Sequence, residues 1–484
     1  MSSAIRELEP RSLWNHFADL NQVPRASKKE EKVIAFIQAF ARQLQLEHHT
    51  DAVGNIIIRK PATPGLESRP VVALQSHLDM VHQKNAATDF NFDTQGIEMY
   101  VDGDWVKAKG TTLGADNGIG VAAIMALLSS SDIPHPALEA LFTIDEETGM
   151  TGAFALEGGL LQAKTLLNLD TEEDHELTIG CAGGIDVTAT AELATTKSIG
   201  QQAYSLQVKG LTGGHSGTEI HLGRGNANKI MNRMLWALHQ EFAIEIATIE
   251  GGSLRNAIPR ESVATLVTDQ HQAAGIQQKV VALEHEIRAE YASTDPHFSM
   301  SWSETIRPEI VLTKEAATTL MAVIYACPNG IYRMSPEIEG LVQTSNNLAR
   351  VQLQQGGRLS IQCLTRSSVE SEKLDLAQAI QACLRLSGAT VTTAGSYPGW
   401  KPEPDAGIVQ LMKNLHLELF GDEAHVLACH AGLECGILGR NYPGMEMISF
   451  GPTILGAHSP DERVQISSVQ KFWKFLLETL QRVA

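Results

Sequence analysis

Three consecutive acidic residues follow one apolar stretch of this sequence. Residues 137–144 (ALEALFTI) have the composition of a buried strand, and Asp145, Glu146 and Glu147 come directly after them. Neighbouring carboxylates repel one another, and burying any of them without a partner is strongly unfavourable. The cluster therefore predicts a positive charge close by, such as a bound metal ion.

Further potential metal ligands follow other strand-like runs in the same way. The run VVALQSH (71–77) ends in His77 with Asp79 two residues later, TLLNLD (165–170) ends in Asp170, and ISFGPTILGA (448–457) leads to His458. Asp116, in TTLGADNGIG (111–120), opens a helical segment between two of these runs. Because the ligands of an open α/β sheet bind beyond the carboxyl ends of its strands, we expect these side chains to converge at one edge.

The adjacent glutamates suggest two different roles. Side chains of neighbouring strand residues point to opposite faces, so Glu146 and Glu147 diverge unless the backbone turns. Thr148 and Gly149 supply the expected turn. One glutamate would then bind a metal while the other reaches a metal-bound water and acts as a general base.

The donor set suits two divalent ions. In this arrangement Asp116 bridges both ions, Glu147 and His458 bind one, and His77 and Asp170 bind the other. Each ion then has three protein ligands and an open position for water, which is the pattern of catalytic zinc. His77 and Asp79 share a strand face, so the Asp79 carboxylate can orient the imidazole. Two bridged ions suit the hydrolysis of amides or phosphoesters.

The elements expected around these residues indicate an α/β sheet with helices on both faces. Expected strands are 54–58, 71–77, 137–144 and 165–170, and expected helices are 29–48 and 118–130. After GCAGGID (180–186) the pattern changes to alternating strands and long amphipathic helices, and near residue 394 the α/β pattern returns. We therefore predict a catalytic domain formed by residues 1–186 and 394–484, with an α+β domain, residues 187–393, inserted into it.

Composition excludes several classes of partner. The formal net charge of −18 argues against nucleic acid or an anionic membrane as the main partner. The first residues show no signal-peptide pattern, and no apolar run reaches the roughly 18 residues that span a bilayer. The six cysteines include no C-x-x-C pair. We expect a cytoplasmic protein with reduced thiols.

Three other motifs are weaker candidates for a site. Residues 118–123 (GIGVAA) have the spacing of a dinucleotide-binding turn, but the preceding Asp116 would repel a pyrophosphate. Residues 214–218 (GHSGT) differ from a nucleophile elbow at the fifth position. Cys429 beside His430 lacks an orienting third group for a thiol nucleophile.

Five motifs occur in the order found in the M20 metallopeptidases: HLDM (77–80), GADNGIG (114–120), EETG (146–149), NLD (168–170) and GAHSPDE (456–462). Over essentially the whole chain the sequence resembles this family, and the stretches KGTTLGADNGIG and GCAGGID resemble its branch of Xaa-His dipeptidases. The resemblance implies an aminopeptidase-like α/β catalytic domain with an inserted α+β lid domain. It also implies a homodimer formed through the lid.

The resemblance assigns roles to single residues. The family's metal ligands fall on His77, Asp116, Glu147, Asp170 and His458, its general base on Glu146, and the aspartate that supports the ligands on Asp79. In the lid, His215 matches a histidine that polarises the scissile carbonyl. Asn256 and Arg366 resemble the groups that hold the substrate backbone and its C-terminal carboxylate, and Gly432 resembles a pocket-lining position of the catalytic domain. The expected cofactor is a pair of Zn²⁺ ions, with Co²⁺ or Mn²⁺ as alternatives.

The resemblance therefore implies a dipeptidase that cleaves Xaa-His dipeptides, including β-Ala-His (carnosine), with Glu146 as the base. Other activities of the same family remain open: a broad dipeptidase, a tripeptidase or an N-acyl amino acid deacylase. A phosphoesterase would need more Arg or Lys near the strand ends than this sequence has. A non-catalytic metal- or peptide-binding protein would be expected to have lost the base, which is present as Glu146.

Overall fold

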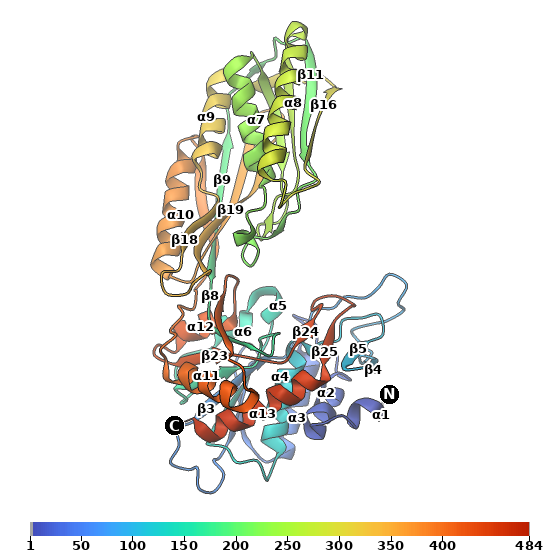
Figure 1. Cartoon of the computed structure of the whole chain (residues 1–484), viewed down its shortest axis with the longest axis vertical. Helices are drawn as coiled ribbons and strands as arrows, with labels where there is room; N and C mark the ends of the chain where they lie inside the picture. The colour runs from blue at the N-terminus through green and yellow to red at the C-terminus, as the bar shows by residue number, and fades with distance from the viewer. Residues whose placement is uncertain (1–2, 484) are drawn as a thin grey trace. The chain divides into compact units, whose positions relative to one another are not determined.

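The computed structural model describes residues 3–483, and the chain divides into two compact units (Figure 1). The first unit comprises Met1–Gly180, Trp400–Ala428 and Leu433–Ala484, and the second comprises Cys181–Gly399 and Cys429–Gly432. The boundaries of the insertion thus lie outside the predicted residues 187 and 393. The reason is that β9 (Gly183–Glu192) and β21 (Thr390–Tyr397) pair with each other inside the second unit.

The first unit is built on an eight-stranded sheet in the order β1-β2-β6-β3-β7-β23-β8-β22. Its strands are β1 (Glu47–Thr50), β2 (Ile56–Lys60), β3 (Val72–His77), β6 (Leu138–Thr143), β7 (Thr165–Asn168), β8 (Glu176–Cys181), β22 (His425–Cys429) and β23 (Glu446–Ser449). The central pairs β6-β3, β3-β7 and β7-β23 are parallel. Every residue of β3 and β6 is buried, as expected for parallel strands covered on both faces. The carboxyl ends of these central strands therefore lie at one edge of the sheet.

Helices surround this sheet. They are α1 (Ser3–Arg6), α2 (Arg11–Leu20), α3 (Glu31–Gln43), α4 (Ala115–Ser129), α5 (Glu146–Gly149), α6 (Thr151–Ala155), α11 (Gly407–Phe420), α12 (Glu434–Asn441) and α13 (Ile466–Arg482). Helix α4 is apolar around its whole circumference and contacts both α2 and β3. A helix without a polar face is stable only inside a core, so α4 is held firmly against the strand that ends in His77.

Two predicted elements of the first unit differ from the structure. The helix expected over 29–48 ends at Gln43, because Gln45 adopts a left-handed backbone (φ 57°) and residues 47–50 form β1. The apolar run before His458 was expected to be a strand of the central sheet, with His458 just beyond its carboxyl end. Instead, His458 lies between β24 (Ile454–Leu455) and β25 (Arg463–Gln465), which belong with β5 (Trp105–Ala108) and β4 (Met99–Asp102) to a separate four-stranded sheet in the order β24-β25-β5-β4.

The second unit is an antiparallel sheet covered by four helices. The strand order is β16-β11-β15-β13-β19-β20-β9-β21, and β18 also pairs with β19. The other strands of this sheet are β11 (Gln202–Lys209), β13 (Glu245–Gly251), β15 (Ser262–Thr268), β16 (Ser299–Thr305), β18 (Gly330–Met334), β19 (Val342–Leu353) and β20 (Arg358–Ser367). Two separate two-stranded sheets are formed by β10 (Thr195–Lys197) with β17 (Ile310–Leu312) and by β12 (Gly214–His215) with β14 (Ala257–Ile258). The helices are α7 (Ala227–Glu241), α8 (Ala273–Glu290), α9 (Lys314–Ala326) and α10 (Glu370–Arg385), with short 3₁₀ turns at Ile220–Leu222 and Gln270–Gln272.

The helices of the second unit bury their apolar faces on its sheet. Helix α7 contacts β11, β15 and β19, while α10 contacts β9 and β20. The shared core includes Met234, Leu266, Ile361 and Leu376, none of which is exposed. No helix among residues 3–483 is both long enough and apolar enough to cross a membrane.

Candidate metal centre

Three of the predicted ligands follow neighbouring parallel strands of the first unit. His77 is the last residue of β3, Asp170 comes two residues after β7, and Glu147 lies just beyond β6. Strand β3 pairs in parallel with both β6 and β7, so these three side chains meet at the same edge of the sheet. The His77 side chain is only 1% exposed, so its chemistry depends on the side chains around it rather than on solvent.

Asp116 stands between two histidines. It lies at the start of α4, where its backbone is not helical (φ −80°, ψ 113°). Its Oδ1 lies 3.1 Å from Nε2 of His77, and its Oδ2 lies 3.1 Å from Nε2 of His458. The two oxygens of one carboxylate are thus directed at two different imidazoles, which is the geometry that a bridging ligand requires.

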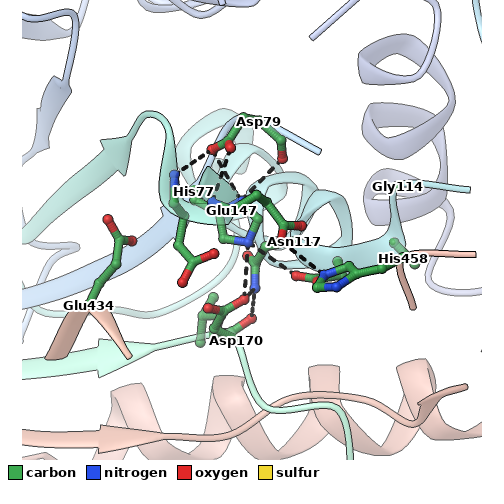
Figure 2. Close-up of polar contacts among 12 residues, drawn as sticks. His77, Asp79, Gly114, Asn117, Glu147, Asp170, Glu434 and His458 are labelled. Carbon is green, nitrogen blue, oxygen red and sulfur yellow. Dashed lines mark hydrogen bonds and ion pairs between the residues drawn. The ribbon is translucent and has the colours of Figure 1, made fainter. Parts of the chain in front are cut away.

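Two ligand groups share Asp116 (Figure 2). His77, Asp116 and Asp170 form one group, and Asp116, Glu147 and His458 form the other; within each group the ligand atoms lie within 4.8 Å of one another. His77 Nε2 is 3.4 Å from Asp170 Oδ1, and His458 Nε2 is 2.9 Å from Glu147 Oε2. One imidazole and two carboxylates in each group are donors that suit zinc, cobalt or manganese.

The electrostatics of these carboxylates show that cations fit the site. Burial raises the pKa of Glu147 and of Asp170, against the opposing effect of the histidines. Oε1 of Glu147 is buried and has no hydrogen-bond partner among residues 3–483. A buried carboxylate oxygen without a donor needs a cation to compensate its lost hydration. The predicted ligands therefore fit a pair of divalent metal ions.

Asp79 connects the ligand strands. Its Oδ1 accepts the backbone N–H of Glu146 at 3.1 Å, and its Oδ2 accepts that of Glu147 at 3.3 Å. The same carboxylate lies 3.5 Å from Nδ1 of His77. Burial raises the pKa of Asp79, but His77 outweighs it and the net pKa is lowered, so the carboxylate stays ionised. Asp79 thereby holds the imidazole and the start of α5 in one arrangement.

The three consecutive acids separate because the chain turns at Asp145. Asp145 has a left-handed backbone (φ 53°), and Thr148 and Gly149, where the turn was predicted, lie inside the short helix α5. The Asp145 carboxylate accepts hydrogen bonds from the hydroxyls of Thr148 and Thr151, away from the two ligand groups. Asp145, Glu30 and Asp79 form a third acidic group. Its carboxylates already accept hydrogen bonds from backbone N–H groups and threonine hydroxyls, so they do not need another ion.

Glu146 remains beside the ligands without belonging to either group. Burial raises its pKa well above the ordinary value, and the carboxylates of Asp170, Glu434 and Glu147 add to that effect against the charge of His77. A carboxylate with a raised pKa takes up a proton more readily, which is what a general base must do.

In the second unit, His215 and Arg366 form a pair of hydrogen-bond donors. The backbone N–H groups of Gly217 and Thr218 donate to Nδ1 of His215 at 3.2 and 3.1 Å, so the proton of the neutral ring is on Nε2. Burial and the charge of Arg366 lower the pKa of His215, which keeps the ring neutral. His215 Nε2 and Arg366 Nη2 are 3.4 Å apart. Two donors this close suit a shared acceptor such as a carboxylate or carbonyl oxygen.

The other two residues predicted near a substrate lie in the same unit. The backbone oxygen of Asn256 accepts the N–H of Ser216 at 2.8 Å, while Asn256 itself is exposed. Gly432 was placed in the catalytic domain, but it belongs to the second unit, because the N–H of Ala182 binds the carbonyls of Cys429 and Ala431 at 3.0 Å. Cys429 with His430 was a weak candidate for a thiol nucleophile because the sequence showed no orienting third group; in the structure, Nε2 of His430 lies 2.8 Å from the hydroxyl of Ser345.

Comparison with known proteins decides the family. The sequence model of "Peptidase family M20/M25/M40" matches residues 73–482. The chain belongs to this family. The M20 peptidase is 40% identical over 482 residues to the cytosol non-specific dipeptidase of Escherichia coli (strain K12), and the match covers 99% of both chains.

Solved structures agree with this assignment. The crystal structure of aminoacylhistidine dipeptidase from Vibrio alginolyticus matches with a TM-score of 0.94 at 40% identity, covering 100% of this chain and 98% of that one. Aminopeptidase PepT from Bacillus cereus matches with a TM-score of 0.58 at 16% identity and shares the fold. The predicted family and the predicted α/β fold are therefore confirmed. Peptidases of this family are two-metal enzymes, which agrees with the two ligand groups that share Asp116.

Two charged residues that sequence reasoning missed hold the Asp116 loop of this M20 peptidase. The carboxylate of Glu462 accepts the backbone N–H groups of Leu113 (2.6 Å), Gly114 (2.9 Å), Ala115 (2.7 Å) and Asp116 (3.3 Å). Arg25, which is fully buried, donates to the carbonyl of Gly114 at 2.6 Å and to those of Leu78 and Asp79 at 3.1 and 3.2 Å. Glu462 ends the motif GAHSPDE and was within reach of sequence reasoning, whereas Arg25 lies in no motif.

Replacing Glu462 by glutamine is expected to destabilise the M20 peptidase by about 2–3 kcal/mol. The side chain keeps its size, but its amide NH₂ then faces backbone N–H donors that Glu462 satisfies. Urea denaturation of the metal-free protein would measure the change in the free energy of unfolding. Asp461→Asn is the matched control, because Asp461 is the exposed neighbour. Equal stability of the two variants would contradict the prediction.

Proposed function

We propose that this M20 peptidase is a two-metal dipeptidase that hydrolyses Xaa-His dipeptides, including β-Ala-His. The observation that carries the proposal is the sharing of Asp116 between two ligand groups with Glu146 beside them. The 40% identity to aminoacylhistidine dipeptidase from Vibrio alginolyticus, over nearly the full length of both chains, supports the substrate class.

In the proposed reaction, His77, Asp116 and Asp170 hold one ion, and Asp116, Glu147 and His458 hold the other. When bound, two divalent ions make a water more acidic and polarise the scissile carbonyl. Glu146 removes the proton of the attacking water and passes it to the leaving amine. Asp79 keeps the His77 ring oriented while this happens.

Residues of the second unit are proposed to bind the substrate. Arg366 suits the C-terminal carboxylate, since a guanidinium pairs with a carboxylate through two parallel hydrogen bonds. The Nε2–H of His215 suits the carbonyl oxygen on which negative charge develops. Asn256 is proposed to contact the substrate backbone, and Gly432 is proposed to line the substrate pocket. A dipeptide can be held at both of its ends in this way, which disfavours longer peptides.

A dipeptidase of broad specificity is the second candidate. The Escherichia coli relative, also 40% identical over 99% of both chains, is described as non-specific. The two candidates share every proposed ligand and the base, so they differ only in how strongly the enzyme prefers histidine as the leaving residue.

The remaining proposals concern metal, assembly and compartment. Zinc is the proposed metal, because each group combines one imidazole with two carboxylates. A homodimer formed through the inserted domain and a cytoplasmic location follow from the family resemblance and from the described location of the Escherichia coli relative. The net charge of −18 supports a small-molecule substrate over nucleic acid or membrane partners.

The test is the release of the C-terminal residue from β-Ala-His, Ala-His, Ala-Leu and N-acetyl-histidine. We expect the zinc-loaded enzyme to cleave the first two fastest, to lose activity when the metal is stripped, and to recover it when zinc is added. Comparable rates for Ala-Leu would favour the broad dipeptidase. A preference for N-acetyl-histidine would indicate a deacylase, and no cleavage by the metal-loaded protein would contradict a peptidase function.

A further inference from the structure

The structure points to Glu434 as the acceptor for the free amino group of the substrate, through its carboxylate oxygen Oε1, which lies buried beside the His77 ligand group and has no partner among the described residues. This inference rests on the proposed dipeptidase function and deepens it. A dipeptide carries an ammonium group at its N-terminus, which an N-acyl amino acid lacks. A residue that recognises this group would set the substrate class of the site.

Chain geometry restricts where such an acceptor can lie. The amino nitrogen of an α-amino acid is two bonds from the scissile carbonyl carbon, about 2.5 Å away, and in β-alanine it is one bond farther. When the carbonyl lies at the ligand groups, the acceptor must be within a few ångströms of them. A buried carboxylate of the first unit close to His77, Asp116 and Asp170 meets this requirement.

Most of the nearby carboxylates are already committed. Asp79 accepts two backbone N–H groups, and Glu462 accepts four. Asp145 accepts two threonine hydroxyls. Glu30 accepts the backbone N–H groups of Lys28 and Asp145. These groups hold the site together and have little capacity left for a ligand.

Glu434 differs from Asp79, Asp145 and Glu462 because only one of its two carboxylate oxygens is occupied, and it differs from Glu30 because its other oxygen is a buried atom without a partner. Its Oε2 accepts from Nε2 of Gln75 at 2.6 Å and from the hydroxyl of Thr143 at 2.7 Å. Its Oε1 is buried and has no hydrogen-bond partner among residues 3–483, and the residue as a whole is 1% exposed. An orphaned buried carboxylate oxygen is costly, and a donor that arrives with the substrate would satisfy it.

Glu434 is bound by side chains of the two strands that lead to the ligands. Gln75 lies two residues before His77 on β3, so both side chains are on the same face of the strand. Thr143 ends β6, the strand that leads to Glu146 and Glu147. Figure 2 shows the Glu434 carboxylate at the side of the ligand cluster where His77 lies.

The charge balance favours a cation at this carboxylate. Burial raises the pKa of Glu434 to about 8; the charge of His77 opposes this, and Asp170 and Asp79 add to it. Glu172, another carboxylate near Asp116 and Asp170, has a pKa raised to about 8 by burial as well. Glu172 is only partly buried, so water can hydrate it, whereas Oε1 of Glu434 is closed to bulk solvent. An ammonium group supplies both the charge and the N–H donors that Glu434 lacks.

The test compares substrates that differ only in the amino group. Removing the amino group from either Ala-His or β-Ala-His gives the same compound, N-propionyl-histidine. We would measure kcat/KM for the three compounds with the zinc-loaded wild type, Glu434→Gln, Glu172→Gln and Glu139→Gln, with metal content determined for each protein. Glu139 is the matched control: it is a glutamate 2% exposed, on the same strand as Thr143 but near the opposite end.

The wild type is expected to prefer the two dipeptides over N-propionyl-histidine, and Glu434→Gln to reduce that preference by about 30-fold or more, since truncating a buried charge pair costs at least that much. Glu139→Gln should keep the preference. An equal loss for all three substrates in Glu434→Gln would show a structural role and overturn the inference. An unchanged preference for the dipeptides in Glu434→Gln would also overturn the inference, because Oε1 would then bind only water. A preference that is lost in Glu172→Gln instead would overturn it as well.

The rates of the wild-type enzyme alone distinguish a failure of this inference from a failure of the proposed function. If it cleaves the dipeptides and N-propionyl-histidine equally well, the dipeptidase function stands and recognition of the amine by Glu434 fails. If it cleaves no dipeptide, the proposed function fails, and the inference that rests on it fails with it.

Discussion

Replacing Glu146 by glutamine is expected to lower kcat for dipeptide hydrolysis by ~10²–10⁴-fold, with both metal ions retained and KM little changed. Glutamine has the same size but cannot take a proton from the attacking water. Glu146 belongs to neither ligand group, so its replacement should remove the proposed base and leave the ligands intact. Steady-state kinetics together with the metal content of the purified variant would measure both effects.

The adjacent glutamate is the matched control for this experiment. Glu147→Gln removes a ligand of the second group, so we expect that variant to lose metal as well as activity. If Glu146→Gln also lost an ion, or kept more than about a tenth of the wild-type kcat, Glu146 would not be the base. The contrast between two neighbours of the same type separates proton transfer from metal binding.

Replacing Asp116 by alanine is expected to weaken the binding of both ions and to reduce activity to background. Asp116 directs one oxygen toward each of the two histidines, at 3.1 Å in both cases. Loss of a residue that merely supports a ligand typically costs ~10–100-fold in metal affinity, so loss of the shared ligand should cost at least that for each ion. Metal content after dialysis, measured beside activity, would determine the result.

Single-group variants provide the comparison for Asp116→Ala. His77→Ala removes a ligand of one group, and His458→Ala removes a ligand of the other, so each should reduce the occupancy of one ion more than that of its neighbour. A variant Asp116→Ala that retained one full equivalent of metal would contradict the bridging role. Occupancy like that of the single-group variants would lead to the same conclusion.

The sequence by itself determined which side chains meet at the edge of the sheet. His77, Glu147 and Asp170 follow apolar runs that had to be buried strands, and parallel strands bring their carboxyl ends to one edge. The order of the five motifs indicated the family, which the comparisons confirm over residues 73–482. These features are local in the sequence: each depends on a short run of residues and on what directly follows it.

Only the tertiary structure decided how the ligands are held and which buried carboxylates keep an oxygen without a hydrogen-bond donor. Glu462 binds the backbone of Leu113 from 349 residues away, Arg25 binds Gly114 from 89 residues away, and Glu434 binds Gln75 from 359 residues away. No periodicity or motif encodes such contacts, because hydrogen bonds of buried charges depend on which distant segments the folded core brings together.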